Sequence, residues 1–421
     1  MRVTNFTPKR EGSAVFKRWR DSVAAGLPPE KLLSRDAKTV LALHCFYNIG
    51  TAMAGVFLNL YLWRLTNDLF VNGMYNIIIF SVTPIFFVIC GYWAKTKDRL
   101  LVFRLGILFT ALFYLAVILA QEHVADYAYG FGVLNGIATG FYWLGYLTLQ
   151  FDMSTQLNRV RFLGFNLIMV NTANLIGPAL AGFIIANSTG LSGYTVVFTI
   201  AFIMFLIASV GSLKLHAHPS HHKTYYIKYT FLMLRKSKDW GKILVAWFIF
   251  GLFNGTMLFI PNILLLQVFG KEDSVGYIGI LFTGITIITS YLYSQKANAS
   301  SERWYAGFTS IFYAVGASIL FWNVTVWTVV AFMIVYAVCF PIQFNFMSAH
   351  NFRTIGSMPL KGGFRVEAIA IREIALSFGR VIAMFAVIIL ADDLYAGTLP
   401  VLLLIGALSQ ALIIFLLNKE D

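Results

Sequence analysis

The chain has 421 residues, of which 58% are hydrophobic and only 12% are charged, whereas soluble proteins have roughly 25% charged residues. This composition excludes a soluble enzyme, a nucleic-acid-binding module and a disordered chain, and the long apolar runs do not fit a transmembrane β-barrel. The net charge of +13 is therefore interpreted as a sign of orientation in a membrane.

The apolar content is sufficient for about twelve membrane-spanning helices, because each helix needs about 20 predominantly apolar residues. A polar tail of about 39 residues comes first, and it is too long to be the basic start of a cleavable signal. Apolar segments then follow in chain order. They cover residues 40–63, 74–94, 100–121, 127–150, 163–187, 194–215, 243–267, 275–294, 304–323, 325–348, 368–391 and 396–417.

Lys and Arg are distributed unequally between the two sides that twelve spans define. The side of the termini collects the basic residues of the tail, of the loop around Lys95 and of the connection 216–242. The other side holds only Arg64 and Lys271, together with several acidic residues. Because cytoplasmic loops are enriched in Lys and Arg, we expect both termini of this multi-pass plasma-membrane protein to be cytoplasmic.

The polar connection 216–242 divides the predicted spans into two sets of six. We expect a cytoplasmic tail over residues 1–39, a helical bundle over 40–215, a central cytoplasmic loop over 216–242 and a second bundle over 243–421. Short similarities at an offset of 206 residues favour duplication of a six-span unit. They pair Asn48 with Asn254, Arg159-Val160 with Arg365-Val366, and Asn174 with Arg380.

Two short motifs accompany this arrangement. The connection between the second and third spans runs from Gly91 to Arg99 and contains Lys95 and Asp98. The fifth span contains small residues around a proline, which would let helices approach closely and would permit a hinge. These residues are Ala173, Gly177-Pro178 and Ala181-Gly182.

The architecture and both motifs resemble the major facilitator superfamily, and the resemblance covers nearly the whole chain. It implies an all-α membrane fold of twelve helices in two pseudo-symmetric six-helix bundles, which transports a solute by alternating access. Gly91, Asp98 and Arg99 resemble remnants of the family's loop motif, in which Lys95 occupies the usual acid position. The alternative is an ordinary basic hairpin on the cytoplasmic side.

The small residues of the fifth span are similar to a motif of drug–proton antiporters. Gly177, Pro178 and Gly182 match it, and this implies efflux. The alternative is a close helix contact with no directional meaning. The Arg that proton antiporters usually carry in the fourth span is absent from residues 127–150.

Charged residues within the predicted spans gather in the eleventh one. Glu373 and Arg380 are seven residues apart and share a helix face with Ser377. Because charges inside a membrane usually face a wet cavity or a partner, Arg380 is a candidate ligand for an anionic group, and Glu373 is a candidate proton carrier. Arg372 and Glu373 are alternatively an ion pair at the cytoplasmic end.

Uncharged polar residues and aromatic residues form a second candidate set. The resemblance implies that they line the substrate cavity, with Tyr47 and Tyr336 as further aromatic walls; for each Asn the alternative is a hydrogen bond between helices. The set consists of Asn48, Asn135, Tyr142, Trp143, Asn171, Asn174, Asn254, Gln343 and Asn345.

Two other features carry less weight. Four histidines between His216 and His222 could bind a metal, but neither acid nor Cys supports them, so we predict no metal and no cofactor. In the tail, Phe16, Trp19 and Val23 predict either an amphipathic helix on anionic lipid or a solvated segment. Nucleotide-binding and hydrolase motifs are missing, which argues against ATP-driven transport and against an enzyme.

The leading hypothesis is therefore a monomeric secondary active transporter that exports a small or amphiphilic solute. We expect the export to be coupled to protons. Its partners would be the substrate, the lipid bilayer and protons, with no nucleic acid. One alternative is a flippase for an anionic lipid or lipid-linked substrate. The other is a membrane scaffold or sensor that keeps the fold without transporting.

Overall fold

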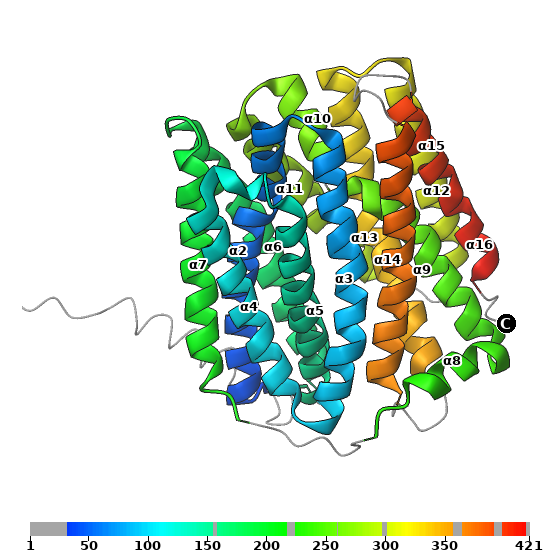
Figure 1. Ribbon diagram of the computed structural model, residues 1–421. Coiled ribbons are helices and arrows are strands. Elements are labelled where there is room, and N and C mark those ends of the chain that lie inside the picture. Colours follow the sequence, from blue (N-terminus) through cyan, green and yellow to red (C-terminus); the bar gives the residue numbers. More distant parts are fainter. Residues whose placement is uncertain are drawn as a thin grey trace, which may run out of the picture.

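A computed structural model of the chain describes residues 32–154, 158–216, 224–258, 260–296, 301–356, 364–390 and 398–417 (Figure 1). The described chain is helical almost throughout. The first six long helices are α2 (Arg35–Thr66), α3 (Leu69–Thr96), α4 (Arg99–Ala120), α5 (Ala128–Asp152), α6 (Arg159–Ala186) and α7 (Ser192–Ser212), with a short 3-10 helix, η2 (Gln121–Val124), after α4.

A short helix, α8 (Ile227–Lys236), precedes the remaining spans. The helices that follow are α9 (Lys238–Met257), α10 (Ile260–Phe269), α11 (Glu272–Lys296), α12 (Glu302–Trp322), α13 (Val326–Gly356), α14 (Arg365–Leu390), α15 (Thr398–Ser409), the 3-10 helix η4 (Gln410–Leu412) and α16 (Ile413–Leu416).

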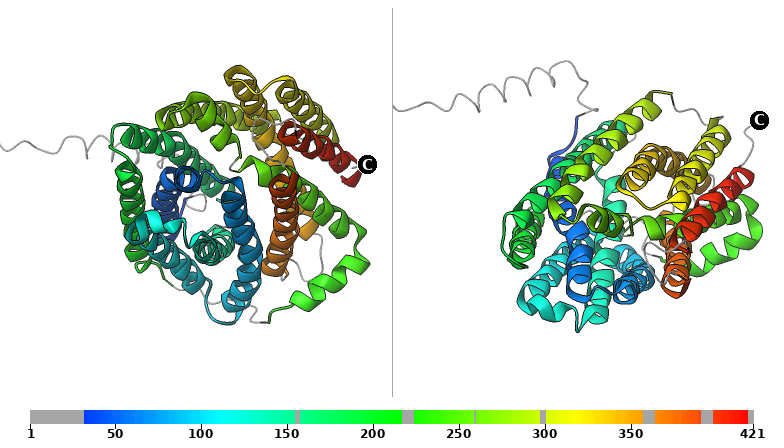
Figure 2. Two further views of the ribbon diagram at one scale, coloured as in Figure 1. Left: turned by 45° about the horizontal axis from the view of Figure 1, so that its top comes forward. Right: turned by 90° about the horizontal axis from the view of Figure 1, so that it is seen from above.

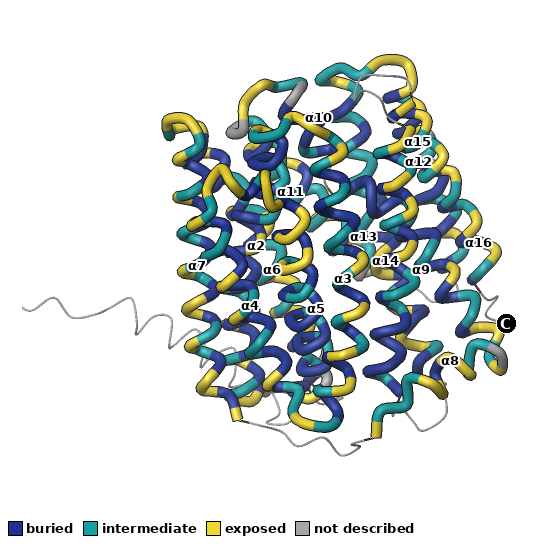
Figure 3. Tube along the Cα trace, in the orientation of Figure 1, coloured by how far each residue is buried: buried dark blue, intermediate teal, exposed yellow. Residues whose placement is uncertain are grey.

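The predicted membrane-spanning architecture is confirmed. Eleven segments of the described chain are long and apolar enough to cross a membrane, and α5, which is 25 residues long, runs alongside them (Figure 1). In this count α9 continues into α10 as one span, and α15 continues into α16 as another. Exposed residues follow the outer faces of the bundle (Figure 3). Many of the exposed residues are large and apolar, as expected where a bilayer covers the protein.

The structure differs from the sequence prediction around the central connection. Part of residues 216–242, predicted as a loop, forms α8 and the start of α9. With ten residues, α8 is too short to span a membrane, and it lies at one end of the bundle (Figure 1). We call this the α8 end, where α2 also begins, and we call the other the opposite end.

The seventh span contains a break that the hydropathy does not reveal. Helix α9 ends at Met257, and α10 begins at Ile260 with Pro261 in its first turn. A proline ring clashes with the carbonyl four residues earlier, which is that of Met257, and it donates no backbone hydrogen bond. The end of α9 at Met257 is thus compatible with the position of Pro261.

The helices form two groups that meet along two contacts, as Figure 2 shows. Helix α3 packs against α14, and α6 packs against α11. We call α2 to α7 the first half and α9 to α16 the second half. Arg159 begins α6 and Arg365 begins α14, so the offset of 206 residues aligns these two interface helices.

Candidate functional site

A cavity of about 620 Å³ lies between the two halves. Helix α2 starts at the α8 end with Arg35, and its cavity-lining residues run from Tyr47 to Asn59. The cavity therefore occupies the middle of the bundle and the part towards the opposite end. Helices α3 to α6 of the first half and α10, α11 and α13 of the second half complete its wall. Its volume is within the range of pockets that hold small-molecule ligands, roughly 300–1,000 Å³.

The wall of this cavity is mainly apolar, contains a set of polar groups and carries no charge. Among the described residues that line it there is no Asp, Glu, Lys, Arg or His. Aromatic and apolar side chains alternate with hydroxyl groups and with a series of amides. The amides are those of Asn48, Asn59, Asn76, Asn135, Asn171, Asn174 and Asn262.

Several residues predicted to bind substrate lie in this wall, namely Asn48, Asn135, Trp143, Asn171 and Asn174. Sequence reasoning missed three further amides, those of Asn59, Asn76 and Asn262. Asn59 could have been found from Asn48, because eleven residues are close to three helical turns and place both on one face. Asn262 follows the unforeseen helix break.

Other predicted substrate ligands lie outside the described wall of the cavity. Tyr142 is buried beneath Tyr47, with ring centroids 3.2 Å apart. Gln343 donates to Gln410 Oε1 at 2.9 Å between α13 and η4, and Asn345 is exposed on the surface of α13. Tyr142 and Gln343 therefore hold helices together in this conformation.

Arg380 and Asn254, also predicted as substrate ligands, form a network next to the cavity. Arg380 Nε donates to Asn254 Oδ1 at 3.0 Å, and Arg380 Nη1 lies 3.5 Å from Glu373 Oε1. The other oxygen of Glu373 lies 3.4 Å from Arg372 Nη2. The Arg380 guanidinium packs over Phe80, 5.1 Å from the ring centroid, and Phe80 lines the cavity. Glu373 thus lies between two cations, one of which, Arg380, is separated from the cavity by the ring of Phe80.

A buried histidine lies beneath the first-half wall, and sequence reasoning did not single it out. His44 Nδ1 is 2.5 Å from the hydroxyl of Tyr142, and the His44 ring stacks on Tyr146 at a centroid distance of 3.5 Å. The Tyr146 hydroxyl donates to Asn166 Oδ1 at 2.5 Å. Together with Tyr47, these rings form a polar aromatic stack that begins at the cavity. A His inside an apolar segment was the signal available in the sequence.

At the α8 end, a buried ion pair joins the two halves. Lys95, near the end of α3, places Nζ 2.5 Å from Oε1 of Glu367 in the first turn of α14, and both side chains are almost inaccessible to solvent. The same Glu367 oxygen accepts the backbone N–H of Tyr226 at 2.8 Å. Lys95 also donates to the carbonyl of Thr224 at 3.3 Å. We call Lys95, Glu367 and residues 224–226 the gate cluster.

The loop motif has a clear physical role around this cluster. A Cβ on Gly91 would lie 2.7 Å from the hydroxyl oxygen of Tyr225, so glycine at this position lets the tyrosine pack closely against α3. Burial, followed by the nearby charge of Glu367, raises the pKa of Tyr225, which therefore stays neutral. Asp98 caps α4 by accepting the N–H of Leu100 at 3.0 Å.

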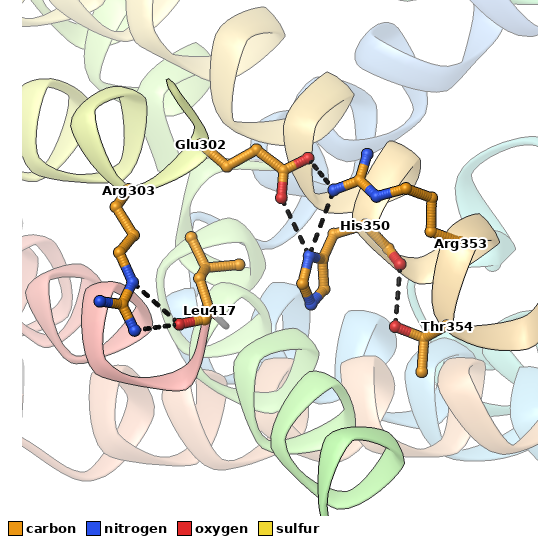
Figure 4. Close-up of polar contacts among 6 residues, drawn as sticks. All are labelled: Glu302, Arg303, His350, Arg353, Thr354 and Leu417. Atoms are coloured by element: carbon orange, nitrogen blue, oxygen red, sulfur yellow. Dashed lines mark hydrogen bonds and ion pairs between the residues drawn. The ribbon is translucent and has the colours of Figure 1, made fainter. Parts of the chain in front are cut away.

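Each half has its own ion pairs at the α8 end. In the first half Arg99 of α4 pairs with Asp152 of α5. In the second half Glu302 of α12 pairs with Arg353 of α13 and lies 2.9 Å from His350 Nδ1 (Figure 4). The signs of the charges are reversed between the two halves.

An arginine of the third span also binds the end of the sixth span in both halves. Arg104 donates to the carbonyl of Ser212, the last residue of α7, at 3.1 Å and to that of Leu215, just after α7, at 2.8 Å. Arg303 donates to the carbonyl of Leu417 after α16, at 3.0 and 2.6 Å (Figure 4). The contacts are of the same kind in both halves, although Arg104 and Arg303 do not correspond at the offset of 206 residues.

The small-residue motif of α6 lies at contacts with two helices. A Cβ on Gly177 would lie 2.8 Å from the Cβ of Ala52 in α2, and a Cβ on Gly276 of α11 would lie 2.6 Å from the carbonyl oxygen of Pro178. Gly182 is buried on the same helix. The motif therefore permits close packing of α6 against α2 and against α11 of the other half.

The predicted absence of metal binding can be compared with only part of the chain. His216 lies 3.5 Å from the carboxylate of Asp36, whereas His218, His221 and His222 lie outside the described residues. Within the described ranges, no group of three or more His, Cys, Asp and Glu side chains could hold a metal ion. The predicted tail helix around Trp19 also lies outside these ranges.

Two curated relatives have no assigned activity in their names. The uncharacterized protein YqgE of Bacillus subtilis (strain 168) is 28% identical over 353 residues, which are 83% of this chain and 81% of the relative. An uncharacterized protein encoded in the sodM 3′ region of Geobacillus stearothermophilus is 36% identical over 172 residues, or 41% of this chain and 80% of the relative.

Solved structures of transporters share the fold at low sequence identity. A bacterial homologue of the iron transporter ferroportin in an inward-facing state has a TM-score of 0.69 at 14% identity, covering 90% of this chain and 98% of that one. The nucleoside transporter NupG has a TM-score of 0.67 at 13% identity, with 91% and 98% covered. A D-xylose-proton symporter has a TM-score of 0.69 at 14% identity, with 90% and 96% covered.

The fold and the family comparison agree. The helices form two halves that enclose a cavity. The family model described as Major Facilitator Superfamily matches residues 40–359, well over half of the chain. The chain belongs to the Major Facilitator Superfamily.

Proposed function

We propose that this secondary transporter exports a small solute from the cell by alternating access of the cavity between the two halves, and that protons drive the export. The observation that carries the proposal is the arrangement of cavity and gate cluster: the cavity extends towards the opposite end, while Lys95 and Glu367 join the halves at the α8 end. Such a structure presents the cavity to one side of the membrane. We also propose that the protein works as a monomer in the plasma membrane, because the cavity lies between two halves of the same chain.

Glu373 is the proposed proton site. It is largely buried between Arg372 and Arg380, next to the α9–α14 contact. In its charged form Glu373 holds the Arg380 guanidinium beside Asn254. Protonation would remove this attraction and free Arg380, which packs on Phe80 in the cavity wall. A proton at Glu373 would in this way change the wall of the substrate cavity.

The direction of transport is proposed from the motif in α6. Gly177 and Pro178 match the pattern of drug–proton antiporters, and their contacts with Ala52 and Gly276 place the motif where α6 meets α2 and α11. A helix pair that slides along such a contact can change the relation of the two halves.

Both alternative functions meet a structural difficulty. A flippase for an anionic lipid needs a cation in the cavity, but Arg380 is bound to Asn254 and Glu373 and does not belong to the described lining. The departure of Lys95 from the loop motif and the missing Arg of the fourth span would favour a non-transporting scaffold. Since Lys95 makes a buried pair with Glu367, this departure keeps a link between the halves.

A flux assay tests the proposal. The purified protein is reconstituted in liposomes of known orientation that contain a pH-sensitive dye, and sugars, nucleosides and lipophilic cations are added with and without a pH gradient. We expect at least one solute to move against its gradient together with a proton signal, and we expect Glu373→Gln to abolish the signal. The matched control, Glu122→Gln, changes an exposed acid in η2 and should have no effect. Solute movement that is indifferent to the pH gradient would contradict the coupling.

A further inference from the structure

The amides of the cavity indicate the chemistry of the solute, and this inference rests on the proposed transport function. Three of them are available to a ligand. Asn171 and Asn174 in α6 and Asn262 in α10 make no side-chain hydrogen bond to any other residue that the structure describes, although all three line the cavity. In contrast, Asn76 donates to Asn59 Oδ1 at 2.8 Å.

These three amides approach the cavity from both halves. Asn171 and Asn174 are three residues apart and lie on one face of α6 in the first half, while Asn262 lies in the first turn of α10 in the second half. Each amide offers two N–H donors and a carbonyl acceptor. A hydroxyl group both donates and accepts, so neighbouring hydroxyls on a ring match this set. A solute that bridges the two helices would connect the halves.

Aromatic side chains supply flat apolar surfaces in the same wall. Trp143 and Tyr75 lie on the first-half side, and Phe282 and Phe340 lie on the second-half side. Rings of this kind bury large apolar areas and stack against flat partners. A ring compound with hydroxyls at its edge and an apolar face would satisfy both kinds of surface.

The absence of charged side chains from the described cavity wall further restricts the class of solute. An ionised carboxylate, phosphate or ammonium group would lose its hydration in the cavity and would find no opposite charge among the described lining residues. We propose that the cavity binds an uncharged polyhydroxylated ring compound, a sugar or a nucleoside, through Asn171 and Asn174 on one side and Asn262 on the other.

Binding to the purified full-length protein tests this directly, by thermal shift and by calorimetry. Methyl glucoside is compared with glucuronate and glucosamine, which have the same ring with one negative or one positive charge, and uridine is compared with uridine monophosphate. We expect binding of a neutral member, with its charged counterparts at least about tenfold weaker. Tighter binding of methyl glucoside would identify the solute as a sugar, and tighter binding of uridine would identify it as a nucleoside. Equal or tighter binding of the charged counterpart, or no binding of either neutral compound, would overturn the proposal.

Variants locate the ligand. Asn174→Leu and Asn262→Leu should each weaken binding of the preferred compound by about tenfold, the equivalent of one or two lost hydrogen bonds. Asn187→Leu is the matched control, because Asn187 is exposed at the end of the same helix α6 and lies outside the cavity wall. Asn174→Asp nearly preserves the shape of the side chain and should raise the affinity for glucosamine relative to methyl glucoside. Unchanged affinities in all three cavity variants would refute the assignment of Asn174 and Asn262 as the side chains that bind the solute.

The two proposals fail in different ways. If the protein binds a neutral ring compound but moves none across a vesicle membrane, the ligand class stands and the transport function fails. If instead the vesicles transport a charged solute and the purified protein prefers that solute, the transport function stands and the ligand class is overturned.

Discussion

Lys95 keeps a link between the two halves although it departs from the family's loop motif. It replaces the usual acid, and Glu367 on α14 supplies the opposite charge, so the two side chains form a buried pair with an N–O distance of 2.5 Å. Removing one partner of a buried pair leaves an unpaired charge, which usually costs about 3–5 kcal/mol. The gate cluster therefore depends on both residues together.

Reversal of this pair is a sharp test at the residue scale. We expect Lys95→Glu and Glu367→Lys each to lower the unfolding temperature of the purified protein, and we expect the double variant to recover most of the loss, because the charges are again opposite. The measurement is thermal unfolding followed by intrinsic fluorescence. The control pair, Lys242 and Asp239, is exposed and separated by 3.8 Å, so its reversal should change little. The pairing would be contradicted if the double variant lowered the unfolding temperature by as much as the two single variants together.

Part of the candidate site could be predicted from the sequence alone. The other residues could not be predicted, because their roles depend on contacts between distant parts of the chain. Asn171 and Asn174 could be recognised because polar side chains in an apolar span are conspicuous. The partner of Lys95 could not be recognised, because Glu367 is 272 residues away in the chain and lies just before the predicted span 368–391. Asn345, equally polar, points out of the site on α13. Polarity thus identified candidates, but only packing decided which of them meet.

At the scale of helices, glycines determine how closely α9 and α14 approach. A Cβ on Gly251 would lie 2.2 Å from the carbonyl oxygen of Leu376, and a Cβ on Gly379 would lie 2.1 Å from that of Phe248. Backbone atoms cannot move aside as a flexible side chain can. This contact also carries Arg380 and Asn254, so the geometry of the network depends on it.

We therefore expect Gly251→Ala to reduce the folded yield and the unfolding temperature strongly, because α9 and α14 would be pushed apart. Gly241→Ala is the matched control in the same helix, since no neighbouring atom lies within 4 Å of its added Cβ. It should be neutral or slightly stabilising, because alanine favours helix more than glycine does by about 1 kcal/mol. Size-exclusion chromatography and thermal unfolding of both variants decide the question. Equal behaviour of the two variants would show that the contact is loose.

The helices themselves were largely predictable, and their ends were less so. The apolar run 74–94 corresponds to α3, which is longer at both ends. The apolar run 325–348 stops before the polar last turns of α13, which continues to Gly356. Hydropathy measures what lipid can cover, whereas a helix continues as long as its backbone is satisfied. Pro84 and Pro341 lie inside unbroken helices, whereas Pro261 coincides with a break. The presence of a proline in the sequence therefore does not by itself predict where a helix ends.

At the scale of the whole molecule, a neutral cavity, the gate cluster and the network of Arg380 and Glu373 lie between and beside the two halves. The cavity lies on one side of the gate cluster, and Glu373 and Arg380 lie beside its wall. Alternating access requires that the Lys95–Glu367 pair separate when the cavity opens at the α8 end. The central claim is therefore that the cavity is open to one side of the membrane at a time.

Accessibility of a single cysteine tests this claim most directly. Cys45, Cys90 and Cys339 are replaced, Thr283 in the cavity wall is changed to Cys, and vesicles are treated with an impermeant maleimide from either side. A separate Lys228→Cys variant on the exposed face of α8 identifies the side of the α8 end. We predict that Thr283→Cys reacts only from the opposite side, and that adding Lys95→Glu makes it reactive from the α8 side. Equal reactivity from both sides with an intact gate cluster, or no response to Lys95→Glu, would contradict the account.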